Sequence, residues 1–156
     1  MKDFSTVQTI TISSQRVADL LCSAFEGGSN YWYEEVEPKV LAPGLTRQDF
    51  SKDGKMQGEP YAHWSTLIAM TEGCSITFRV AESSPYAADK LPAGFPLTVK
   101  DDVCHVTLDR AAIEKGVALF PVKEPKHFAD FMAALDDATT GDVFLQLCCF
   151  GEVVFA

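Results

Sequence analysis

Residues 17–36 read VADLLCSAFEGGSNYWYEEV, a stretch that changes from a helical pattern to a strand pattern across a glycine pair. Its apolar residues recur at the spacing of one helix face, at Val17, Leu20, Leu21, Ala24 and Phe25. Ser13 or Ser14 can cap this helix, and Gly27 is expected to end it in a left-handed conformation. Residues 31–36 then favour a strand, because aromatic and β-branched side chains are common in strands.

Three other segments predict strands because polar and apolar side chains alternate along them: 7–12, 75–80 and 103–108. Residues 64–70 are apolar, but the segment is too short for its period to distinguish a strand from a helix. Residues 153–155 are a further candidate strand.

Capping residues and prolines predict the remaining helices. Asp109 can cap a helix that Pro121 is expected to end, and Pro125 suits the first turn of the next one. That next helix is expected to face the core with Phe128, Phe131, Met132 and Leu135. Residues 143–150 favour a helix capped by Thr140 and closed by Gly151, although a buried strand would have a similar pattern.

These elements interleave without a βαβ repeat, which favours an α+β fold with a mainly antiparallel sheet and about three to four helices. A chain of 156 residues is the size of one domain, and we expect residues 1–156 to form one. Residues 38–60 have weak patterns and turn signals, and they predict a long loop or flap. Prolines and a glycine predict an irregular connection over residues 83–102.

The formal net charge of −9 argues against direct binding to nucleic acid, which depends on clusters of lysine and arginine. Glu34, Glu35 and Glu37 form a candidate acidic surface. It has two interpretations, a solvated surface that keeps the protein soluble or a mimic of nucleic acid that occupies a basic groove.

The cysteines predict a reducing compartment. There are five, an odd number without a Cys-x-x-Cys spacing, which favours buried thiols over disulfides or a zinc site. The first residues do not resemble a signal peptide, and no stretch is apolar enough to span a membrane. We therefore expect a cytoplasmic protein in a bacterial host cell, without a membrane partner.

The sequence contains no catalytic, phosphate-binding or metal-binding motif, so we expect neither an enzyme nor a cofactor or metal site. Cys104 and His105 are neighbours on a predicted strand and would point to opposite faces. Cys148 and Cys149 are expected to be buried packing residues. His127 and Asp130 share a helix face, where a surface hydrogen-bonded pair is the preferred interpretation over a metal site.

Aromatic and polar side chains gather in two segments that could bind a planar ligand or a protein. The candidate binding residues are Asn30, Tyr31, Trp32, Tyr33, His63 and Trp64. The alternative is that Trp32 and Trp64 are core residues with paired indole N–H groups, and that Asn30 is a left-handed turn residue.

Several blocks resemble a family of uncharacterised phage and prophage proteins. They are RVADLL (16–21), EGGSNYW (26–32), HFADF (127–131), GDVFLQ (141–146) and FGEVV (150–154). The resemblance implies an accessory phage protein that acts in the bacterial cytoplasm, and it carries no established activity.

Three functions remain open from the sequence. The first is a non-enzymatic accessory protein that binds and blocks a bacterial host protein, and the second is a module that binds or sequesters a nucleotide-like small molecule. The third is an enzyme whose site brings distant residues together, such as His63, His105 and a carboxylate. A homo-oligomer is compatible with each of these functions.

Overall fold

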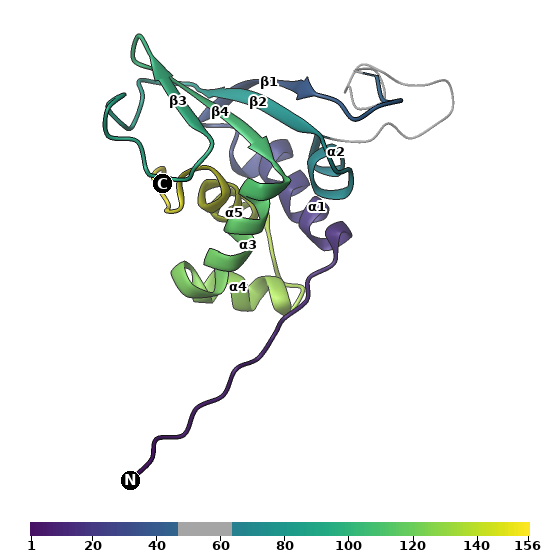
Figure 1. The fold of residues 1–156 in the computed structure, drawn as a ribbon, viewed down its shortest axis with the longest axis vertical. Coiled ribbons are helices and arrows are strands. Elements are labelled where there is room, and N and C mark those ends of the chain that lie inside the picture. Colours follow the sequence, from purple (N-terminus) through teal and green to yellow (C-terminus); the bar gives the residue numbers. More distant parts are fainter. Residues whose placement is uncertain (47–63) are drawn as a thin grey trace.

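The fold places a four-stranded sheet over a layer of helices (Figure 1). The computed structural model describes residues 1–46 and 64–156. In order, these ranges contain α1 (Ser14–Ser23), the π-helix η1 (Ala24–Gly28), β1 (Tyr33–Val40), α2 (Trp64–Met70), β2 (Ser75–Val80), β3 (Leu97–Lys100), β4 (Val103–Asp109), α3 (Arg110–Lys123), α4 (Pro125–Met132) and α5 (Ala138–Phe150). The α+β single-domain fold that the sequence predicts is confirmed, with five α-helices in the described ranges instead of about three to four.

The sheet is antiparallel throughout, in the spatial order β1-β2-β4-β3. Along β4, the buried residues Cys104, Val106 and Leu108 alternate with more accessible ones. Because successive side chains of a strand point to opposite faces, this alternation gives the sheet one face towards the helices and one towards solvent. The predicted strands at 75–80 and 103–108 are confirmed.

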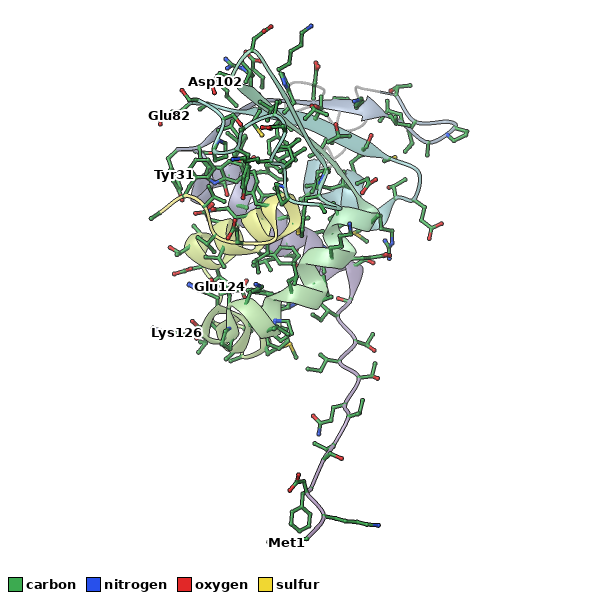
Figure 2. The ribbon with its side chains drawn as sticks, turned by 60° about the vertical axis from the view of Figure 1, so that its left-hand side comes forward. Met1, Tyr31, Glu82, Asp102, Glu124 and Lys126 are labelled. Carbon is green, nitrogen blue, oxygen red and sulfur yellow. The ribbon has the colours of Figure 1, made fainter. Side chains whose placement is uncertain are left out.

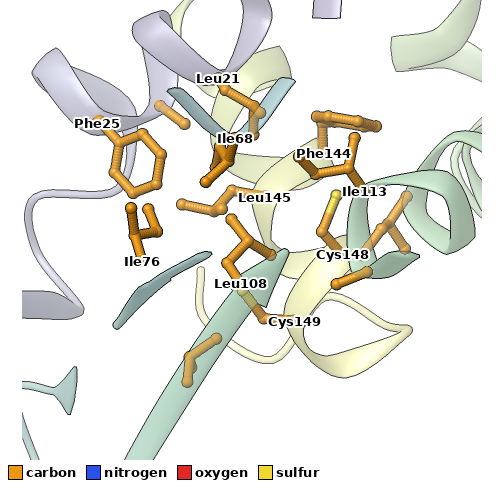
Figure 3. Packing of buried hydrophobic residues seen from close by; sticks show 14 of the residues in the cluster. Leu21, Phe25, Ile68, Ile76, Leu108, Ile113, Phe144, Leu145, Cys148 and Cys149 are labelled. Carbon is orange, nitrogen blue, oxygen red and sulfur yellow. The ribbon is translucent and has the colours of Figure 1, made fainter. Parts of the chain in front are cut away.

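Helix α5 lies at the centre of the core, where residues from α1, α2, β4 and α3 surround it (Figure 3). Eleven of its thirteen residues are buried, so it is covered by other elements on nearly every side. The predicted helix over 143–150 is confirmed, and Gly151 closes it with a φ of 76°. The N-cap is Asp137 and not Thr140, because the Asp137 side chain accepts from the Thr140 backbone N–H at 2.9 Å.

The first helix begins as predicted and ends differently. The Ser13 hydroxyl accepts from the Arg16 N–H at 3.2 Å and caps α1. The expectation of a left-handed Gly27 is wrong, since neither Gly27 nor Gly28 has a positive φ. Instead the helix widens into η1, and the N–H of its C-cap residue, Ser29, bonds to the Ala24 carbonyl at 2.9 Å.

Gly28 has a packing role that explains why a glycine stands there. A Cβ atom at this position would overlap the backbone carbonyl of Ala138, at the start of α5. Gly141 is similar, because its Cβ would lie 2.8 Å from the Leu20 carbonyl oxygen. These two glycines allow the backbones of η1, α1 and α5 to approach closely.

Two predicted strands are wrong. Residues 7–12 are extended but pair with no strand in the described part of the chain, and Val7 is fully exposed. Their alternation is a strand pattern without a neighbouring strand to complete it. Residues 153–155 also lie outside the sheet, because hydrogen bonds to a side chain hold their backbone instead.

Helix α3 continues through Pro121, contrary to the prediction that this residue ends it. Pro121 lies in the last turn, and the Glu124 N–H still bonds to the Phe120 carbonyl at 3.0 Å. Helix α4 begins at Pro125 as predicted, but its core-facing stripe is shorter than expected. Met132, the last residue of the helix, is 50% exposed, and Leu135, which lies beyond the helix end, is 72% exposed.

The outcomes differ for the three segments with weak patterns, 64–70, 83–102 and 38–60. Residues 64–70 form a helix, and the segment predicted to be irregular over 83–102 contains strand β3. The predicted loop or flap at 38–60 starts inside β1, which extends to Val40, and its residues 47–60 lie outside the described part of the chain.

Candidate functional site

A buried carboxylate on α5 collects hydrogen bonds from residues far away in the sequence. Asp142 is 7% exposed, and its Oδ1 accepts from the Ser29 hydroxyl and the Trp32 indole N–H, each at 2.7 Å. Its Oδ2 accepts from the Tyr31 hydroxyl at 2.7 Å. The amide of Gln146, four residues along the helix, donates to Oδ1 at 3.2 Å. We call Ser29, Tyr31, Trp32, Asp142 and Gln146 the Asp142 network.

The same Gln146 side chain fastens the last residues of the chain to α5. Its Oε1 accepts from the backbone N–H groups of Val154 and Phe155 at 2.7 and 2.8 Å. Its Nε2 donates to the Phe155 carbonyl at 3.1 Å. Gln146 thus bonds residues 154 and 155 as a neighbouring strand would, and the Phe155 ring stacks on Trp32 with centroids 5.3 Å apart.

The Asp142 network affects how its tyrosine titrates. The pKa of the Tyr31 phenol is raised to about 12, mainly by burial and then by the hydrogen bond and the charge of Asp142. Burial also raises the pKa of Tyr33 to about 12, and the charge of Glu26 adds to this effect. Both phenols are therefore protonated well above the ordinary tyrosine value of 10.0.

We expect folded and unfolded protein to differ in their tyrosine titration. In the unfolded chain the phenols lose their protons near pH 10, whereas Tyr31 and Tyr33 hold theirs to about 12. The stabilisation is complete below pH 10 and is lost as the pH rises towards 12, because the unfolded state then binds fewer protons. Phenolate absorbance, measured with and without urea, checks this prediction. In Tyr31→Phe, the part of the phenolate absorbance that develops well above pH 10 should be smaller. If the tyrosines of the native protein titrated around pH 10, the prediction would be contradicted.

The structure separates the predicted binding residues. Trp32 is 1% exposed and belongs to the core, which is the alternative that the sequence left open. Tyr31 is 48% exposed, and the Tyr33 hydroxyl donates to Phe25 O and to Asn30 Oδ1. Asn30 is exposed without a positive φ, so it is not the left-handed turn residue considered above.

Two of the predicted binding residues, His63 and Trp64, cannot be placed relative to the segment from Asn30 to Tyr33. His63 lies outside the described residues, and Trp64 begins α2 with a side chain that is also outside the description. In the described part of the chain, the predicted pocket is therefore reduced to the segment from Asn30 to Tyr33.

A small cavity does lie beside that segment. Its volume is about 210 Å³, and it is lined by Tyr31, Trp32, Val80, Glu82, Phe155 and Ala156. Figure 2 shows Tyr31 and Glu82 on the same side of the molecule. The Glu82 carboxylate disfavours a phosphate-bearing ligand, and the cavity is smaller than the roughly 300–1,000 Å³ of ordinary ligand sites. Its geometry gives little support to a nucleotide pocket.

The acidic residues lie on the edge strand β1. Glu34 pairs in register with Arg79 and Glu37 with Thr77, and both β2 partners alternate with buried residues. Arg79 forms ion pairs with Glu34 and with Glu35, the latter at 2.9 Å from Nε to Oε2. These residues therefore share the sheet face that points away from the helices.

The regular alternation of a strand is interrupted in β1 at Glu35. This residue has a φ of 61°, and the register with β2 shifts between Glu34 and Glu37. Such a bulge re-aims side chains, and here it lets the neighbours Glu34 and Glu35 both reach Arg79.

The predictions for Cys104, His105, Cys148 and Cys149 agree with the geometry. Cys104 is fully buried and His105 is exposed, so this adjacent pair is divided between the two sheet faces. Burial raises the pKa of the Cys148 and Cys149 thiols, both of which pack in the core. The sequence predicted a pair of His127 with Asp130, but the neighbour that the structure gives to His127 Nδ1 is the Thr140 hydroxyl, at 3.5 Å. Among residues 1–46 and 64–156, no group of three or more acids, histidines or cysteines could hold a metal ion.

The sequence patterns did not point to the centre of the Asp142 network. A usable signal exists, because Asp142 and Gln146 are the polar residues of an otherwise apolar run and are spaced four apart on a helix. Polar groups inside a core need hydrogen-bond partners, so their presence predicts donors from elsewhere in the chain.

Comparisons of the chain with models of protein families, with curated proteins and with solved structures found no match. No helix in the described ranges is long and apolar enough to cross a membrane. Three of the sequence blocks noted above nevertheless meet in space. Residues 26–32, 141–146 and 150–154 contribute the Asp142 network and the segment that Gln146 holds.

Proposed function

We propose that this chain is a non-enzymatic, phage-type accessory protein that binds a bacterial host protein and blocks it. We assign the binding to the acidic face, defined as Glu34, Glu35 and Glu37 on the solvent side of β1. The observation that carries the proposal is the position of these acids: they gather on the sheet face opposite the helices, on an edge strand.

The ion pairs of this face favour recognition of another protein. Arg79 holds Glu34 and Glu35 in place, so these two carboxylates need less ordering when a partner arrives. Arg79 also offsets part of the local charge, which suits a discrete basic patch better than an extended phosphate-binding groove. The overall charge of −9 would steer a basic partner towards the protein before contact.

The state of the buried polar groups supports a non-enzymatic role. Asp142 accepts hydrogen bonds on both oxygens, and within the described residues no buried side-chain oxygen or nitrogen lacks a partner. A carboxylate engaged in this way stabilises the fold and is not directed at a substrate.

The test uses native mass spectrometry on tagged protein that is purified gently from a bacterial host. It compares the unmodified chain with two charge-reversal variants. Glu35→Lys/Glu37→Lys changes the acidic face, and Glu72→Lys/Asp89→Lys makes the same change in charge at exposed positions elsewhere. We expect a stoichiometric bacterial protein with the unmodified chain and with the control. The acidic-face variant should bind at least tenfold more weakly, equivalent to about 1.4 kcal/mol.

Salt provides an independent check, because contacts between exposed charges weaken as ionic strength rises. Affinity for the captured protein should fall with added salt for the unmodified chain and much less for the acidic-face variant. Equal affinity of the two double variants would show that β1 is not the binding surface. An assay of the partner's own activity then tests whether binding blocks it.

A further inference from the structure

The cavity beside Trp32 combines aromatic residues with a carboxylate, a composition that suits a positively charged ligand. Its lining includes the aromatic residues Tyr31, Trp32 and Phe155, and Glu82 adds a negative charge. Tyr31 and Glu82 lie on the same side of the molecule (Figure 2). The face of an aromatic ring carries partial negative charge, so it attracts a cation that lies over it. Rings and carboxylate therefore favour the same kind of ligand.

The described part of the chain does not itself supply a cation to this cavity. Glu82 is exposed, and within residues 1–46 and 64–156 it forms no ion pair. In the same ranges, no lysine or arginine lies over the ring of Tyr31 or Phe155. The net charge of −9 adds a general attraction for positive ligands. A cation from solution therefore finds the negative groups of the cavity accessible.

A second carboxylate lies directly behind the aromatic residues. Asp142 accepts from the Tyr31 hydroxyl and from the Trp32 indole N–H, each at 2.7 Å. Its charge is one of the causes that raise the pKa of Tyr31 to about 12, so the field of the carboxylate reaches the phenol. A hydrogen bond to a carboxylate also polarises the ring that donates it, which strengthens the attraction of the ring for a cation.

The residues around the cavity are held in place before any ligand arrives. The backbone of Phe155 is bonded to the Gln146 side chain, and its ring stacks on Trp32 with centroids 5.3 Å apart. Tyr31 is fixed by its bond to Asp142. Groups that are already ordered lose less conformational entropy on binding. The Asp142 network therefore supports the cavity as well as the core.

Size and hydration narrow the class of cation. A cavity of about 210 Å³ has the volume of roughly seven waters at about 30 Å³ each, so it suits a molecule with a similar number of non-hydrogen atoms. A calcium or magnesium ion needs several oxygen ligands, and one lining carboxylate does not provide them. A primary ammonium is strongly hydrated, so its transfer into a partly apolar cavity costs more than that of an alkylated ammonium.

We infer that this cavity binds a small molecule that carries an alkylated ammonium group, such as trimethylammonium. The cationic group lies against Tyr31 and Phe155, and Glu82 balances its charge on the exposed side. This site is independent of the proposed partner surface. Val80, which lines the cavity, is buried on the helix side of the sheet, whereas the acidic face lies on the opposite side.

The test titrates choline chloride into the isotope-labelled full chain at constant ionic strength and follows the amide and indole signals by NMR. The signals of Tyr31, Glu82 and the Trp32 indole should shift, with a dissociation constant of about 1 mM. The neutral alcohol in which carbon replaces the choline nitrogen should bind about tenfold more weakly, because it has the same shape without the charge. Ethanolamine, the primary amine, should also bind more weakly than choline.

Variants separate the contribution of the ring from that of the charge. Tyr31→Leu and Tyr31→Phe both lose the bond to Asp142, but only phenylalanine keeps an aromatic ring. Choline should bind Tyr31→Leu about threefold more weakly than Tyr31→Phe, or weaker still. Glu82→Gln should weaken binding by about three- to fivefold. Glu72→Gln is the matched control, since it makes the same change at an exposed residue outside the lining, and it should not alter the affinity.

Each of the other results would contradict a defined part of the inference. The absence of shifts around the cavity at about 10 mM choline, tenfold above the expected dissociation constant, overturns the site. Equal binding of choline and its neutral analogue overturns the choice of a cation. Equal affinity of Tyr31→Leu and Tyr31→Phe overturns the role of the ring. Tighter binding of a peptide that contains trimethyl-lysine overturns the small molecule as the source of the ammonium group.

Discussion

Replacing Asp142 by alanine is expected to destabilise the protein by about 3–5 kcal/mol, a large share of the roughly 5–15 kcal/mol that holds a domain together. The substitution removes the acceptor for Ser29, Tyr31 and Trp32 at once, and for the Gln146 amide as well. Donors left without partners inside a core incur the full cost of desolvation. Urea unfolding followed by tryptophan fluorescence measures the loss.

Asp142→Asn is the matched control because it keeps the size of the side chain and one oxygen acceptor. That oxygen can serve the three donors that now bond to Oδ1, and the new amide can donate to the Tyr31 oxygen. We expect a loss of about 1–2 kcal/mol, from the weaker bonds that a neutral acceptor makes. If Asp142→Ala lowered the free energy of unfolding no more than Asp142→Asn, the Asp142 network would not contribute to stability as described.

Alanine is expected to have opposite effects at two adjacent glycines. Gly28→Ala should destabilise the protein by about 2–3 kcal/mol, because the added Cβ would overlap the Ala138 carbonyl, a backbone group that cannot rotate away. Gly27→Ala places its Cβ where no other atom lies within 4 Å, and the backbone there does not have a positive φ. It should stabilise by about 0.4–1 kcal/mol, since alanine restricts the unfolded chain more than glycine does.

The measurement is a pair of thermal or urea unfolding curves on the two single variants. Helix propensity alone would move both curves in the same direction, because both glycines belong to η1. A difference in sign therefore reports the contact between η1 and the start of α5. Equal shifts would mean that this approach is looser than the structure indicates.

Features with local causes could be predicted from the sequence. The helix caps depend on a side chain and an N–H three residues away. Asp109 is confirmed, and of the two candidates Ser13 and Ser14 the cap is Ser13. The strands at 75–80 and 103–108 follow from alternation that one buried sheet face imposes. The helix that contains residues 143–150 was favoured over a strand mainly by its flanking Thr140 and Gly151, and of these only Gly151 has the expected role.

Features that depend on distant partners could not be predicted. The strand pattern of residues 7–12 is genuine, but whether it becomes a strand depends on a neighbour that the chain itself does not place there. The sequence is compatible with Trp32 as a binding residue and as a core residue. Its burial and its bond to Asp142, a distant residue, place it in the core. The role of Gly28 likewise depends on Ala138, far along the chain.

The hydrogen bonds to Asp142 also determine the order in which parts of a newly synthesised chain can fold. They join Ser29, Tyr31 and Trp32 to a residue 110 to 113 positions later, and Gln146 then secures residues that follow it by eight and nine. A ribosome makes the early aromatic segment long before its partner exists. Until α5 has emerged, the Trp32 ring remains partly exposed to solvent, and chaperones can bind it during that interval.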